Sequence, residues 1–151
     1  MSPTAIPLLH VEDDRIQQVL LPHQLAGLQE YRFDITFATS EEGALKIFLG
    51  GGFELVILDY HLTQGDGMSC LRQIRQIDPI VPVIAVSGVA SDEIAAELIS
   101  AGADDYLAKQ TLDNKTLGQS VRNVLTRAKA FRARIETLGK PTPAVPPLNG
   151  V

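Results

Sequence analysis

The chain has 151 residues, of which 45% are hydrophobic, and its 13 basic and 18 acidic side chains give a formal net charge of −5. This length suits one domain with a full hydrophobic core, and the hydrophobic content is too high for a disordered chain. The negative charge does not favour sequence-independent binding to nucleic-acid phosphates, so we expect no direct nucleic-acid binding.

Targeting and redox features point to one compartment. No apolar run approaches the roughly 20 residues of a membrane helix, and residues 1–7 lack the basic and apolar regions of a secretory signal. The single cysteine, Cys70, excludes an internal disulfide and fits a reducing environment. We therefore expect a cytoplasmic protein that makes no contact with a membrane.

Five segments are predicted to be strands. Leu8–Val11, Leu55–Leu58 and Val83–Val86 are nearly continuous apolar runs, as is typical of parallel strands that are covered on both faces. Phe33–Phe37 and Asp105–Ala108 are weaker candidates.

Helices are predicted between these strands. The first covers about Asp14 to Gly27, and Pro22 in its interior should kink or split it. Thr39 to Glu42 has the pattern of a capping box for a helix that continues to about Leu49. The remaining helices are predicted from about Met68 to Ile77, from Ser91 or Asp92 to Gly102, and onward from near Asp113.

A β-α order repeated along the chain predicts an α/β fold, with an open, doubly wound parallel sheet and helices on both faces. In such sheets, ligands bind beyond the carboxyl ends of the strands. The residues at those ends are Glu12, Asp13, Asp59, Ser87 and Lys109. We therefore expect these five side chains to converge on one edge.

The carboxylates at this edge repel one another. Two carboxylates about 5 Å apart repel by roughly 3 kcal/mol at an effective dielectric of 20, so Glu12, Asp13 and Asp59 need a counter-ion or a raised pKa. An oxygen-only ligand set suits Mg²⁺, and a carboxylate can accept a phosphoryl group. Lys109 and Ser87 supply a positive charge and a hydroxyl for phosphate oxygens. The pattern therefore predicts Mg²⁺-assisted phosphoryl transfer.

Together the segments around these residues resemble the receiver domain of bacterial response regulators, which has the CheY-like, flavodoxin-like fold. The resemblance extends from about Ile6 to Leu125 and implies a five-stranded sheet of order 2-1-3-4-5 with an extended C-terminal helix. The matching segments are Leu8–Asp14, Leu55–Asp59, Gly65–Met68, Val83–Gly88 and Ala101–Lys109.

By this resemblance Asp59 is the phosphoacceptor. Asp13 and Asp59 would bind Mg²⁺ directly, Glu12 would act through water, and the backbone carbonyl of His61 would complete the protein ligands. Lys109 would contact the phosphate. The phosphoryl donor implied is a phosphohistidine on a sensor histidine kinase or on a histidine phosphotransfer protein.

The resemblance also implies a switch and an output surface. Ser87 would move toward the phosphoryl group, and Tyr106 would change rotamer. The fourth helix, fifth strand and fifth helix form the face that carries the signal to a downstream partner protein.

Two positions depart from the family pattern. Gln110 follows Lys109, where the family usually has a proline in a cis peptide bond, so the loop is expected to be trans and differently shaped or to store strain. Thr63 follows Leu62, where a proline is common, and we expect only a local change in the loop.

We expect three regions: a receiver domain over residues 1–126, an extension of the last helix over 127–139, and a flexible Pro-rich tail over 140–151. Too few residues remain after the helix for an output domain, so signalling is expected to need a partner. Phe131, Ile135 and Leu138 lie among basic residues and could fold back, pair with a second copy or dock a partner. They complete a heptad pattern that consists of Leu117, Val121, Val124, Ala128, Phe131, Ile135 and Leu138.

Three other functions compete with this interpretation. A phosphatase or phosphotransferase with an aspartyl nucleophile commonly has a second carboxylate two residues later, where this chain has His61. A flavin-binding electron carrier would need a glycine- and hydroxyl-rich loop in place of Glu12-Asp13-Asp14. A receiver that binds partners without phosphorylation remains open because of Gln110. We expect no enzyme activity beyond the chain's own phosphorylation and dephosphorylation.

Overall fold

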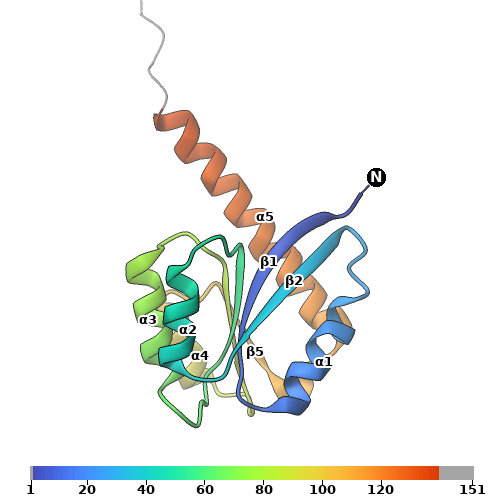
Figure 1. Ribbon diagram of the computed structural model, residues 1–151, viewed down its shortest axis with the longest axis vertical. Coiled ribbons are helices and arrows are strands. Elements are labelled where there is room, and N and C mark those ends of the chain that lie inside the picture. The colour runs from blue at the N-terminus through green and yellow to red at the C-terminus, as the bar shows by residue number, and fades with distance from the viewer. Residues whose placement is uncertain (1, 140–151) are drawn as a thin grey trace, which may run out of the picture.

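The computed structural model describes residues 2–139 as one parallel sheet with helices on both faces (Figure 1). The Pro-rich tail predicted over 140–151 lies outside these residues. The strands are β1 (Thr4–Val11), β2 (Tyr31–Ala38), β3 (Leu55–Asp59), β4 (Val83–Ser87) and β5 (Asp105–Ala108). The helices are α1 (Arg15–Leu25), α2 (Glu41–Leu49), α3 (Gly67–Ile77), α4 (Asp92–Ser100) and α5 (Asn114–Gly139), with a 3-10 turn at Lys109–Thr111.

The strand order is β2-β1-β3-β4-β5, and every neighbouring pair is parallel, which confirms the flavodoxin-like topology. All residues of β3 and β4 are buried, because helices cover both sides of the central strands. The first and second strands are longer than their apolar cores predicted. β1 begins at Thr4 and β2 begins at Tyr31, and these two residues are paired across the strands.

Alternating side chains of each central strand enter two separate cores. Leu9 and Val56 belong to the core under α2, α3 and α4, whereas Leu8 and Leu55 belong to the core under α1 and α5. Cys70 is fully buried in the first of these cores, and burial raises the pKa of its thiol to about 12. Its position agrees with a packing role.

The helix starts are capped by short polar side chains. Asp14, Asp66 and Ser91 each accept a hydrogen bond from a backbone N–H two or three residues ahead. The cap predicted at Thr39 was one residue too early, because the hydroxyl of Ser40 accepts from the Gly43 N–H at 3.0 Å.

Pro22 does not split α1, which is continuous from Arg15 to Leu25. A single proline removes one backbone donor, while Leu21 and Leu25 on either side are buried in the core and keep the helix against the sheet. No helix within residues 2–139 combines the length and apolar character needed to cross a membrane. The last helix, α5, runs past the amino-terminal ends of the strands (Figure 1).

Candidate phosphoryl-transfer site

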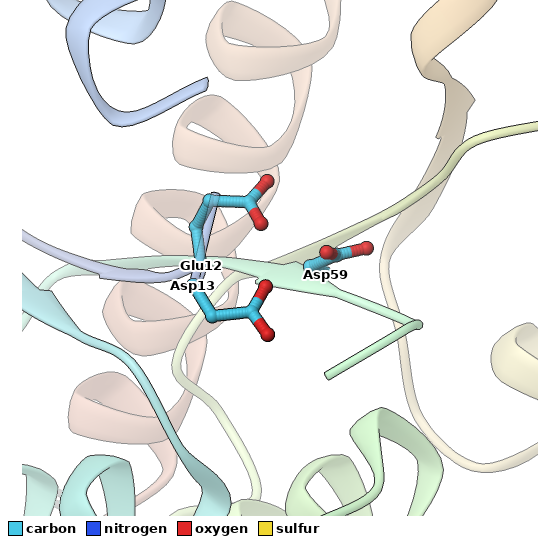
Figure 2. Close-up of side chains that lie close together, drawn as sticks. All are labelled: Glu12, Asp13 and Asp59. Carbon is cyan, nitrogen blue, oxygen red and sulfur yellow. The ribbon is translucent and has the colours of Figure 1, made fainter. Parts of the chain in front are cut away.

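Two adjacent strands bring three carboxylates together at the carboxyl edge of the sheet (Figure 2). Glu12 and Asp13 follow β1, and Asp59 ends β3. One oxygen from each side chain lies within 4.8 Å of the others. This oxygen-only set fits a hard divalent cation such as Mg²⁺ better than a softer metal.

Two of these carboxylates are buried beside one ammonium group. Glu12 is 1% exposed and Asp59 is 5% exposed. The Lys109 Nζ donates to Glu12 Oε1 at 2.7 Å and to Asp59 Oδ2 at 3.2 Å. A single ammonium cannot neutralise three ionised carboxylates, so a further cation, or protonation of one carboxylate, would relieve the remaining repulsion.

The pKa shifts have distinct causes. Burial raises the pKa of Glu12 to about 7, helped by Asp59 and opposed by the hydrogen bond from Lys109. Burial alone lowers the pKa of Lys109, but Glu12 and Asp59 outweigh it and the net shift is upward. Hydrogen bonds from Thr63 lower the pKa of Asp13. The site therefore favours the charged forms of Lys109 and Asp13.

The loop between β3 and α3 contacts both neighbouring aspartates. The His61 N–H donates to Asp59 Oδ1 at 3.1 Å, and the Thr63 N–H donates to Asp13 Oδ2 at 2.7 Å. Gly67 allows this tight path, because a Cβ there would lie 2.5 Å from the Asp59 carbonyl oxygen. The sequence did not single out Thr63 as a contact of Asp13, since a backbone donor leaves no signal in residue type.

The two residues predicted to act as a switch share one acceptor. Ser87 Oγ donates to the Val89 carbonyl at 3.0 Å, and the Tyr106 hydroxyl donates to the same oxygen at 2.9 Å. Ser87 is buried at the end of β4, beside the strand that carries Asp59. The structure thus joins Ser87 and Tyr106 through the β4–α4 loop.

The departure at Gln110 does not displace Lys109. The Lys109–Gln110 peptide bond is trans, and residues Lys109–Thr111 form a 3-10 turn. The Lys109 ammonium still reaches Glu12 and Asp59. A proline is therefore not needed to bring this lysine to the site.

The parallel fold and the acidic edge with its lysine define a class of signalling domain. The sequence model of the Response regulator receiver domain family matches residues 8–122. The chain belongs to this family and is a receiver domain of a two-component response regulator.

Known proteins similar to this chain support the same assignment. The transcriptional regulatory protein ZraR of Escherichia coli K12 is 30% identical over 145 residues, which cover 96% of this chain and 30% of ZraR. The receiver domain of a putative LuxO repressor from Vibrio parahaemolyticus superposes with a TM-score of 0.75 at 28% identity, over 91% of this chain and 99% of that one.

A CheY-like receiver protein from Methanospirillum hungatei has a TM-score of 0.75 at 22% identity, over 84% of this chain and 98% of that one, and supports the fold. The chain spans less than a third of the length of ZraR. Receiver domains generally bind Mg²⁺ at an acidic pocket and interact with histidine kinases or phosphotransfer proteins.

Proposed function

We infer that Asp59 accepts a phosphoryl group from a phosphohistidine on a sensor histidine kinase or phosphotransfer protein, in the cytoplasm and in a Mg²⁺-dependent reaction. The observation that carries this proposal is the contact of buried Asp59 with Lys109, beside Glu12 and Asp13. A buried, partly neutralised carboxylate group next to a lysine suits a carboxylate nucleophile.

In the transfer step a carboxylate oxygen of Asp59 forms a P–O bond while the P–N bond of the donor histidine breaks. The electron pair of the broken bond stays on the imidazole nitrogen. The His61 N–H and Lys109 hold the Asp59 carboxylate in place before the reaction. Lys109 then stabilises negative charge on the transferred group.

The metal would be held by Asp13 and Asp59, by Glu12 through water, and by the backbone carbonyl of His61. The clustered oxygens of Glu12, Asp13 and Asp59 support this assignment. When bound, Mg²⁺ supplies positive charge that offsets the charge of the carboxylates and of the phosphate.

We expect the output to begin at Ser87. Movement of its hydroxyl toward the phosphoryl group would break its hydrogen bond to the Val89 carbonyl, and a rotamer change of Tyr106 would break the second hydrogen bond to that oxygen. This change in the β4–α4 loop would pass the signal to a downstream protein through the face formed by α4, β5 and α5. The chain would act as a switch and not as an enzyme with substrate turnover.

The extension of α5 is a second contact surface in this proposal. We assign residues 1–126 to the receiver and 127–139 to the extension, where Phe131, Ile135 and Leu138 are 51%, 43% and 81% exposed. A parallel helix pair with this heptad would bring Arg127 of one copy toward Arg132 of the other, which is unfavourable. An apolar partner surface with acidic residues therefore fits better than a homodimer.

Acetyl phosphate and mass spectrometry test the proposed reaction. With Mg²⁺, the wild-type protein is expected to gain one phosphoryl group per chain, and Asp59→Asn is expected to gain none. A chelator should abolish the modification. Sustained hydrolysis of a small phosphomonoester would instead support a phosphatase, and equal labelling of wild type and Asp59→Asn would overturn the assignment of Asp59.

A further inference from the structure

The loop between β3 and α3 connects the site with α2. On one side, its backbone contacts the site through the His61 N–H on Asp59 and the Thr63 N–H on Asp13. A proline in place of Thr63 would lack this donor, so the loop of this chain is bonded directly to Asp13. The position of the loop therefore affects the position of the Asp13 carboxylate.

On its other side the loop is bonded to one residue of α2. The backbone N–H of Glu41 donates to the Gln64 carbonyl at 3.2 Å. The Glu41 Oε1 accepts from the Asp66 N–H at 3.0 Å. Its Oε2 accepts from Ser69 Oγ and from Gln73 Nε2, each at 2.5 Å. A single side chain thus joins α2 to the end of the loop and to the first turns of α3.

Gly65 permits the close approach of the loop to Glu41. Gly65 has a φ of +98°, which L side chains rarely adopt, and a Cβ there would lie 2.5 Å from the Cβ of Glu41. The loop and the start of α2 are therefore in close contact at this point. Sequence reasoning placed Glu41 only within a helix cap and did not connect it with the site.

Glu41 acts as a hydrogen-bond acceptor throughout this contact. Every side-chain hydrogen bond of Glu41 found among the described residues is one that it accepts, and none of the ion pairs there includes it. Glu41→Gln keeps the size of the side chain but replaces one acceptor oxygen with a donor NH₂ group. At least one of its present donors then loses an acceptor oxygen and has to reorient.

We propose that Glu41 is a positioning residue for phosphoryl transfer. By holding the β3–α3 loop, Glu41 keeps the Thr63 N–H hydrogen-bonded to Asp13 and the His61 peptide beside Asp59. The proposal rests on the assignment of Asp59 and its acidic neighbours as the Mg²⁺-dependent site. Glu41 touches none of these groups and acts only through the loop.

The test measures Mg²⁺ binding without a phosphoryl donor. Isothermal titration of wild type, Glu41→Gln and the control Glu42→Gln gives the dissociation constants, and the amide NMR signal of Thr63 reports the loop. Glu42 is the exposed neighbour of Glu41 on the same helix. Loss of a partner that is hydrogen-bonded directly to a metal ligand typically weakens metal binding by about 10- to 100-fold, and Glu41 acts one contact further away, so the lower end of this range applies. We expect about a 10-fold weaker affinity in Glu41→Gln, a shifted Thr63 amide, and no change in Glu42→Gln.

Gly65→Ala approaches the same contact from the loop side. It should also weaken Mg²⁺ binding and shift the Thr63 amide, because the added Cβ pushes the loop away from Glu41. The rate of phosphorylation by acetyl phosphate should fall in both variants at limiting Mg²⁺ and recover at saturating Mg²⁺. A purely structural role for Glu41 would lower thermal stability without this recovery.

Two failures are distinguishable. If the wild-type protein binds Mg²⁺ and is phosphorylated on Asp59, but Glu41→Gln and Gly65→Ala both match Glu42→Gln in affinity and in the Thr63 amide, the positioning role is wrong and the proposed function stands. If the wild-type protein neither binds Mg²⁺ nor accepts a phosphoryl group, the proposed function fails, and the positioning role fails with it.

Discussion

The two ends of the sheet differ in which side chains they bury and which they expose. At the carboxyl end, Glu12, Asp59 and Lys109 are charged or titratable groups held largely away from water. At the amino end, α5 and the first residues of β1 line an open groove of about 780 Å³. Beyond this groove the same helix exposes apolar side chains, among them Leu138.

The parallel strands explain this difference. All of their carboxyl ends meet at one edge, so polar residues that follow the strands are brought together by the fold itself. Burying like charges there lowers stability unless cations are near. Exposed apolar residues at the other end change folding stability little and instead favour contact with another molecule. Substitutions of charged residues at the carboxyl end should therefore change the free energy of unfolding, whereas substitutions of exposed apolar residues at the amino end should change it little.

The largest expected effect comes from removing Lys109. Within residues 2–139, its ammonium group is the only one that contacts the buried carboxylates of Glu12 and Asp59. Lys109→Ala leaves Glu12 and Asp59 without their shared partner, and breaking a buried ion pair costs about 3 kcal/mol or somewhat less where one partner is partly exposed. We expect a loss of roughly 2–3 kcal/mol in the free energy of unfolding, measured by urea denaturation in a chelator.

Lys46→Ala is the matched control for this change, because Lys46 is exposed on α2 and takes part in none of the ion pairs described for residues 2–139. Its effect should stay within about 0.5 kcal/mol. Equal losses in the two variants would mean that Lys109 does not relieve repulsion at the site.

The second effect is stabilisation by the metal. A ligand that binds only the folded state adds about 2.7 kcal/mol at a concentration of 100 times its dissociation constant. At a Mg²⁺ concentration of 100 times the wild-type dissociation constant, we expect this gain in the free energy of unfolding for wild type and a much smaller gain for Asp13→Asn. Chemical denaturation at a series of Mg²⁺ concentrations measures both.

A variant at the amino end sharpens the contrast. Leu138→Ser leaves the carboxylate cluster of Glu12, Asp13 and Asp59 intact, so its Mg²⁺ response should equal that of wild type. A reduced response in this variant would show that the two ends are coupled.

The smallest expected effect on stability lies in the α5 extension. Leu138 is 81% exposed, and a surface substitution such as Leu138→Ser usually changes the free energy of unfolding by less than about 0.5 kcal/mol. Light scattering is expected to give a monomer for wild type, because Arg127 and Arg132 oppose self-pairing. A wild-type dimer that Leu138→Ser dissociates would establish a homodimer instead.

The sequence predicted the fold and the members of the site because both follow from strongly patterned residues. Apolar runs located β1, β3 and β4, and the acids and lysine after the strands predicted which side chains would meet. The structure shows that these side chains meet, whereas the roles of all the site residues in metal binding, phosphoryl transfer and switching remain predictions.

Other features depended on contacts that residue types do not encode. The cap shifted from Thr39 to Ser40, and α1 continued through Pro22 because its neighbours pack into the core. The hydrogen bond from the Thr63 N–H to Asp13 and the one from Ser87 to the Val89 carbonyl each use a backbone atom, so no residue pattern predicts them. Glu41 joins segments that are distant in sequence, and only the folded chain brings them together.

The most direct test compares the unfolding free energies of wild type and Asp59→Asn in a chelator and in saturating Mg²⁺. Removing one carboxylate from a cluster in which neighbours about 5 Å apart repel by roughly 3 kcal/mol should make Asp59→Asn more stable than wild type without metal. Mg²⁺ should stabilise wild type more and so reduce or reverse this difference. An Asp59→Asn protein that is less stable than wild type in chelator, with no difference in its response to Mg²⁺, would contradict the account.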